Sequence, residues 1–143
     1  MQKIWKQLIC LYAMAQGLDA LPRPVDVASG EVAIAEIDSG VMQIEASDRA
    51  IINYTDFSIA RGEKVRFIQP SKEAVVLNRV VGSDPSKILG RMTSNGRVVL
   101  VNPNGVYFGK DAIVDTGSLI VSTLDILDQD FLESKYSFTL ISK

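Results

Sequence analysis

The sequence predicts an all-β fold, and two observations support that prediction. Short segments rich in Val, Ile, Phe and Tyr recur along the chain, and glycines separate most of them at intervals too short for a helix. Such short links exclude parallel strands joined by crossover helices for most of the chain. Two architectures fit this pattern: an antiparallel sandwich or barrel, and a β-solenoid whose coils themselves supply the return path.

The expected strands follow one another closely after Pro22 and Pro24. Their ranges are 32–37, 41–46, 50–54, 64–69, 74–81, 88–92, 98–101, 106–108, 112–114, 119–124 and 136–141, each with the length and enrichment of a strand. The remaining segment, 125–135, can form a helical turn because Leu124, Leu127 and Phe131 are spaced i, i+3, i+7, and a loop at a solenoid edge is the alternative. Asn-Gly at 95–96 and 104–105 suits tight hairpins, but it suits solenoid corners equally. Phe67, Ile88 and Phe108 are 21 and 20 residues apart, which is compatible with stacked coils.

Composition limits the chemistry of the chain. Its 143 residues are 47% hydrophobic and 22% charged, with a net charge of −2, which fits one globular domain with a substantial core. The acidic balance argues against nucleic acid as a partner. With no His and one Cys, the commonest metal ligand, the usual general base and any disulfide are missing. We therefore expect no enzyme activity, no cofactor and no metal site.

Residues 1–20 have the layout of a secretory signal peptide. Lys3 and Lys6 precede an apolar run at 8–15, and Gly17 and Ala20 are small residues suited to cleavage. The run is much shorter than the roughly 20 residues that span a bilayer. An N-terminal amphipathic helix is the alternative interpretation. We expect a folded domain over 21–143, without cysteine and with a net charge of −3.

The turn at Asn102, Pro103, Asn104 and Gly105 is the most informative motif. Asn102 can bond to the backbone ahead, Pro103 fixes φ, and Asn104 and Gly105 tolerate the left-handed region. Asn78 and Arg79 form a second candidate site, a polar pair within an apolar strand. We expect Asn78 to bracket neighbouring backbone and Arg79 to be a surface charge.

Two further groups of residues are interpreted without a ligand. The acidic residues Asp125, Asp128, Asp130 and Glu133 lack the central glycine and the regular spacing of a calcium loop, which favours a solvated face. Asn53-Tyr54-Thr55 matches a glycosylation acceptor, relevant in a eukaryotic secretory pathway.

Several motifs in order resemble one family. They are INYTDFSI (52–59), VRFIQPS (65–71), VVLNRVVGSDPSKILGRM (75–92), NGRVVLVNPNGVYFG (95–109) and SLIVSTLDI (118–126). Together they resemble the filamentous haemagglutinin N-terminal domain, the secretion domain of exoproteins exported by bacterial two-partner secretion. The resemblance implies a right-handed parallel β-helix with an N-terminal cap and extra-helical strands. It matches the Asn-Pro-Asn-Gly-aliphatic motif at 102–106, whereas the family's Asn-Pro-Asn-Leu motif is absent and Tyr54 stands where many members have Trp.

By that resemblance the domain is a secretion address and a folding seed. It implies export by the Sec machinery through the periplasm, recognition by the POTRA domains of an outer-membrane transporter, and an extracellular or cell-surface destination. Family members extend further, so we expect 21–143 to be C-terminally incomplete, with host surface glycans or receptors bound by the missing regions. The alternative function is a carbohydrate-binding or carbohydrate-cleaving β-helix, suggested by the solenoid and its scattered carboxylates.

Overall fold

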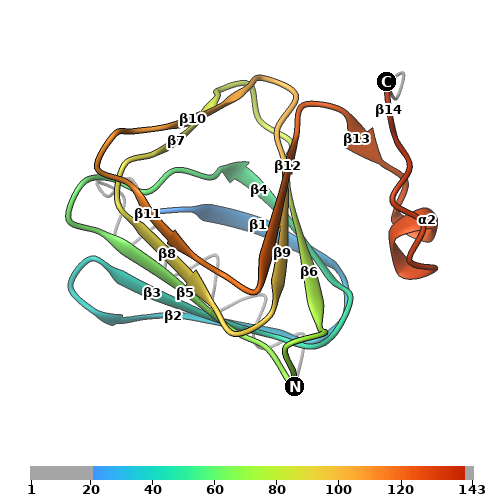
Figure 1. Ribbon diagram of the computed structural model, residues 1–143, viewed down its shortest axis with the longest axis horizontal. Helices are drawn as coiled ribbons and strands as arrows, with labels where there is room; N and C mark the ends of the chain where they lie inside the picture. Colours follow the sequence, from blue (N-terminus) through green and yellow to red (C-terminus); the bar gives the residue numbers. More distant parts are fainter. Residues whose placement is uncertain (1–20, 141–143) are drawn as a thin grey trace.

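The chain folds as a parallel β-helix of about four turns, seen end-on as a triangle in Figure 1. A computed structural model describes residues 21–140. The strands are β1 (Arg23–Ser29), β2 (Val32–Asp38), β3 (Val41–Ala46), β4 (Ala50–Asp56), β5 (Lys64–Ile68), β6 (Val75–Val80), β7 (Ser86–Ile88), β8 (Arg91–Ser94), β9 (Arg97–Val101), β10 (Val106–Phe108), β11 (Ile113–Asp115), β12 (Ser118–Ser122), β13 (Asp125–Ile126) and β14 (Phe138–Thr139). The helix α2 covers Asp128–Leu132. The solenoid, rather than the sandwich, is confirmed.

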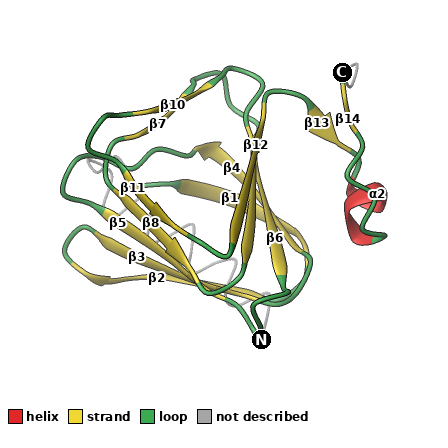
Figure 2. Ribbon diagram, viewed as in Figure 1, coloured by secondary structure: helices red, strands yellow, loops and turns green. Residues whose placement is uncertain are grey.

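Three sheets form the sides of the triangle. One side is a five-stranded sheet in the order β1-β4-β6-β9-β12, another is β11-β8-β5-β3-β2, and the third pairs β7 with β10. Figure 2 shows the loops gathered at the corners between these sides. Both Asn-Gly dipeptides therefore lie in corners and make no hairpin.

The N-terminal end of the helix is capped by antiparallel strands. β1 pairs antiparallel with β4, and β2 pairs antiparallel with β3, whereas every later pair within the coils is parallel. The two cap strands thus cover the edges of β3 and β4, which would otherwise present unpaired N–H and C=O groups. The predicted N-terminal cap is present.

Register aligns residues of successive coils. Val106 pairs with Ser86, and Ser118 pairs with Arg97. Ile88 and Phe108 are also register partners, as their spacing predicts. Phe67 is not part of that column, because it pairs with Ser94 on another side of the triangle.

The main core fills the interior of the coil stack. Its fully buried members include Ile44, Ile52, Tyr54, Phe67, Val76, Ile88, Met92 and Leu100. These side chains come from alternate positions of strands on all three sides, as the two-residue period of a strand requires. Burial of this stack of apolar side chains is the main stabilising term of the fold.

A second core lies outside the triangle. β13, α2 and β14 pack there, with Ile126 and Phe131 against outward-facing residues of β4, β6 and β9 (Figure 1). Leu77 and Val99 belong to this outer core, while Val76 and Leu100 point inward. β6 and β9 are therefore buried on both faces, which explains the uninterrupted apolar runs at 74–77 and 98–101. We call residues 123–140, which carry β13, α2 and β14, the strap.

Some expected elements differ from the structure. β1 is not among the expected strands; it contains Pro24, which is compatible with its position at the edge of the sheet. The expected strand 88–92 is two strands that meet at the corner around Gly90. In the strap the helical turn is present, but Leu127 is exposed and Phe131 alone of the stripe is buried.

The predicted signal peptide, 1–20, lies outside the described residues. Within 21–140, none of the helical structure is long and apolar enough to span a bilayer.

Candidate functional site

The Asn102–Gly105 motif forms a hydrogen-bonded turn at the corner between β9 and β10. The Gly105 N–H donates to the Asn102 carbonyl at 3.0 Å, and the Asn102 Oδ1 accepts from the Asn104 N–H at 2.9 Å. Gly105 has φ of 110°, which glycine adopts without the steric cost of a Cβ. The turn therefore uses Asn102 and Gly105 in the roles that their sequence predicts.

Asn102 also joins three successive coils. Its Nδ2 donates to the Asp84 carbonyl at 3.0 Å and to Ser86 Oγ at 2.9 Å, both in the preceding corner. Its backbone N–H donates to the Ser122 carbonyl of the following coil at 3.0 Å. The side chain is fully buried, so each of these bonds forms away from water, where an unpaired amide is costly.

Asn104 and Pro103 form the outer half of the same corner. The Asn104 Nδ2 donates to the Gly82 carbonyl at 2.8 Å and to Asn102 Oδ1 at 2.9 Å, while both residues stay exposed to solvent. Gly105 accepts from the Ser86 N–H at 3.0 Å. The motif is thus stacked on the corner below and presents one polar edge outward.

A second asparagine corner occurs at Asn95, whose Asn-Gly dipeptide is compatible by sequence with a hairpin or with a solenoid corner. Asn95 Oδ1 accepts from the Gln69 N–H, and its Nδ2 donates to the Gln69 carbonyl, both at 2.7 Å. Gln69 in turn donates to Ser94 Oγ at 2.9 Å and to the Arg97 carbonyl at 3.0 Å. The repeated Asn-Gly dipeptide marks the position of both corners in the sequence, but the same dipeptide also suits a hairpin.

Asn78 points into the interior of the stack. Its Oδ1 accepts a 2.6 Å hydrogen bond from the Tyr54 hydroxyl, and its Nδ2 donates to the Val99 carbonyl at 3.2 Å. Burial raises the pKa of the Tyr54 hydroxyl well above its ordinary value. The three residues lie on β4, β6 and β9, so this polar chain crosses neighbouring coils.

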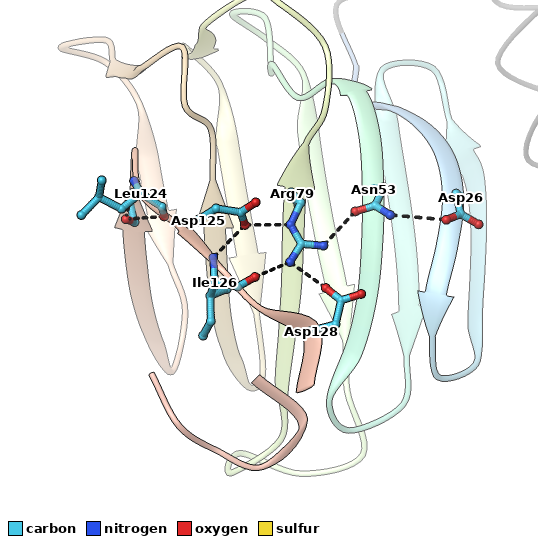
Figure 3. A network of polar contacts seen from close by, with 8 residues as sticks. Asp26, Asn53, Arg79, Leu124, Asp125, Ile126 and Asp128 are labelled. Atoms are coloured by element: carbon cyan, nitrogen blue, oxygen red, sulfur yellow. Dashed lines mark hydrogen bonds and ion pairs between the residues drawn. The ribbon is translucent and has the colours of Figure 1, made fainter. Parts of the chain in front are cut away.

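Arg79 differs from the surface charge that the sequence predicts. It is on the outward side of β6 under the strap, and its side chain is only 12% exposed. Figure 3 shows the guanidinium surrounded by acceptors: Nε bonds Asp125 Oδ1 at 2.9 Å, and Nη2 bonds Asp128 Oδ1 at 2.7 Å and the Ile126 carbonyl at 2.6 Å. Burial opposes the charged form, but these carboxylate bonds raise the pKa of Arg79 above its ordinary value.

The acidic residues of the strap are accordingly not one solvated face. Asp125 and Asp128 bind Arg79, whereas Glu133 pairs with Lys135 at 3.2 Å. No grouping of His, Cys, Asp and Glu within residues 21–140 is suited to hold a metal ion. The glycosylation acceptor Asn53 accepts from Arg79 Nη1 and donates to Asp26, both at 3.3 Å, so it belongs to the same network (Figure 3).

A pocket of about 390 Å³ near Gly90, at the corner between β7 and β8, has two carboxylates in its lining, Glu63 and Asp111. Glu63 Oε1 accepts the Ala60 N–H at 2.9 Å, and Asp111 pairs with Arg61 at 4.0 Å. The Glu63 carboxylate is thus bonded to the backbone of its own corner, whereas the Arg61–Asp111 pair is long and exposed.

The capped parallel β-helix with its asparagine corners places this domain in the class of β-solenoids. The family model for the TPS secretion domain matches residues 20–142, and the chain belongs to that family. Its fold resembles the crystal structure of the HMW1 secretion domain from Haemophilus influenzae, with a TM-score of 0.74 and 38% identity, over 76% of this chain and 29% of that one. The predicted family is confirmed. Domains of this family target two-partner exoproteins for secretion across the outer membrane, with an outer-membrane transporter as partner.

Two curated relatives carry the name heme/hemopexin-binding protein, both from Haemophilus influenzae, one of them from strain Rd. They are 36% and 33% identical to this chain over 115 residues, which is 80% of the chain. The chain spans only 12% of the length of either relative. The likeness therefore concerns the secretion domain.

Proposed function

We propose that this domain is read by the POTRA domains of its outer-membrane transporter before it folds, and that it then seeds the folding of the exoprotein outside. One observation carries this order of events. In the folded domain Asn102 is fully buried, with both side-chain polar atoms bonded within the protein. A partner that reads this asparagine must meet the chain before the coils stack.

Strand addition supplies the physical means of recognition. An extended chain can add to an exposed sheet edge of a partner, with main-chain hydrogen bonds giving affinity and alternate side chains giving specificity. The short strands of this chain alternate inward and outward side chains, which suits that mode. Once outside, each coil stacks on the one before, so the folding free energy accumulates there and opposes return.

The proposed route begins with Sec export, using residues 1–20 as signal, and passes through the periplasm. After Cys10 the sequence has no cysteine. No disulfide can therefore form in residues 21–143 in the oxidising periplasm and block threading. The proposal gives the domain no catalytic role; its buried asparagines, Asn78 and Asn102, join neighbouring coils.

Co-expression with the cognate transporter tests this function. We expect the chain in the medium when the transporter is present and in the periplasm when it is absent. Retention in the periplasm with the transporter present would contradict the proposal. Binding of the purified POTRA domains to the urea-unfolded and the folded chain, after rapid dilution, tests the order: we expect capture of the unfolded chain only, and equal capture of both would contradict it.

A further inference from the structure

The two Asn-Gly corners carry a chemical property that the secretion role does not require. In an Asn-Gly pair, the glycine backbone nitrogen can attack the asparagine Cγ, expelling ammonia and closing a succinimide, which water opens to aspartate or isoaspartate. Asparagine is among the thermolabile residues for this reason. Asn95-Gly96 and Asn104-Gly105 are the only Asn-Gly pairs of the sequence, and Asn102 is followed by proline, whose nitrogen cannot close the ring.

At Asn104 the corner holds both reacting groups away from this reaction. The attacking nitrogen, that of Gly105, donates its hydrogen to the Asn102 carbonyl at 3.0 Å. The leaving amide nitrogen donates to the Gly82 carbonyl at 2.8 Å and to Asn102 Oδ1 at 2.9 Å. Ring closure at Asn104 would need both sets of bonds to break.

At Asn95 the protection is of the same kind. Its Oδ1 and Nδ2 form a pair of 2.7 Å bonds with the Gln69 backbone, and the Gly96 N–H donates to Ser94 Oγ at 3.0 Å. Of the partners at the two corners, Gln69 and Gly82 belong to the preceding coil, and Ser94 and Asn102 belong to the same corner as the asparagine. The bonds to Gln69 and Gly82 therefore exist only after two coils have stacked, whereas the bonds to Ser94 and Asn102 are local to each corner.

We propose that Asn95 and Asn104 are deamidation sites that coil stacking protects, so that their conversion records how long the chain has been unfolded. At Asn104 the conversion is damaging, because a carboxylate cannot donate to the Gly82 carbonyl and its charge would face carbonyl oxygens. This proposal concerns the chain alone and does not depend on the transporter.

The test is incubation of the full chain at mildly alkaline pH, folded or in urea, followed by peptide mass spectrometry that distinguishes aspartate from isoaspartate. We expect both asparagines to convert at least about tenfold more slowly in the folded chain, because only opened molecules react. Asn102 should stay unmodified in both samples. Equal rates at Asn104 in the folded and unfolded chain would overturn the proposal.

Asn102→Ala separates local from global protection. This change removes the acceptor of the Asn104 N–H and of its Nδ2 but leaves the Asn95 corner intact. The change also removes the bonds of the buried Asn102 Nδ2 to Asp84 and Ser86, so stability falls and both rates rise, but we expect the Asn104 rate to rise by the larger factor. If both rates rise by the same factor, the corner bonds give Asn104 no protection beyond that of the stacked fold, which would contradict the assignment of its protection to those bonds.

Discussion

The Tyr54 hydroxyl donates a 2.6 Å hydrogen bond to Asn78 Oδ1 inside the coil stack. Both side chains are fully buried, and the Asn78 Nδ2 donates a hydrogen bond to the Val99 carbonyl. Tyr54 also packs edge-to-face on Phe57, with ring centroids 5.0 Å apart. This side chain thus combines an apolar body with a polar end that matches a buried acceptor.

Replacing Tyr54 by Phe keeps the ring contact and removes the hydroxyl. Because Asn78 Oδ1 then loses its donor in the core, we expect the free energy of unfolding to fall by about 1–3 kcal/mol. Urea unfolding followed by circular dichroism measures it. Tyr136→Phe, at an exposed ring, is the matched control and should change stability by less than about 0.5 kcal/mol. Equal effects of the two changes would contradict the role of the Tyr54–Asn78 bond.

Tyr54 also predicts a pH dependence. Its pKa is raised in the folded state, so the folded chain keeps a proton that the unfolded chain releases above about pH 10. The stabilising contribution of this group is complete below that pH and is lost as pH rises, at roughly 1.4 kcal/mol per pH unit. The stability difference between the wild type and Tyr54→Phe should therefore shrink between about pH 9 and 11. Parallel stability curves for the two proteins would refute this.

Arg79 is expected to fix the strap. Arg79→Ala leaves Asp125 and Asp128 without their cation beside an apolar surface, at a cost of about 1–3 kcal/mol, moderated because Asp128 is half exposed. Limited proteolysis should cut residues 123–140 sooner in the variant. Arg79→Lys should restore little, since one ammonium cannot reproduce the spread of the guanidinium's bonds. Arg66→Ala, at a surface residue on β5, is the control, and cleavage of the strap at the same rate in both variants would count against the network.

Two glycine changes separate crowding from backbone strain. A Cβ at Gly82 would overlap the Thr55 carbonyl oxygen, so Gly82→Ala must displace backbone of the neighbouring coil. We expect the free energy of unfolding to fall by an amount near the upper end of the roughly 1–3 kcal/mol typical of overpacking. Gly62 has φ of 84° but open space around it, so Gly62→Ala should cost about 1 kcal/mol. Thermal unfolding of both variants gives the comparison. A Gly82→Ala protein as stable as the wild type would show that the corner is not closely stacked.

Local pattern predicted the strands well and long-range partners poorly. The strands at 41–46 and 106–108 have the predicted bounds, because glycines and the Asn-Gly turn delimit them. The solenoid itself came from resemblance, since an Asn-Gly corner and an Asn-Gly hairpin have the same local sequence. The prediction of a surface charge at Arg79 is wrong because its acceptors, Asp125 and Asp128, lie on the strap. The residues that flank Arg79 in the sequence do not indicate these partners.

The Asn102–Gly105 corner is the centre of this account, and Asn102→Ala combined with Asn104→Ala tests it most directly. Ile52→Ala, which removes core volume at an expected cost of about 2–5 kcal/mol, is the stability-matched control. Export with the cognate transporter and thermal unfolding are measured for the wild type, the double variant and Ile52→Ala. We predict that the double variant loses stability and reaches the medium less than Ile52→Ala does. Normal secretion together with unchanged thermal stability in the double variant would contradict the account.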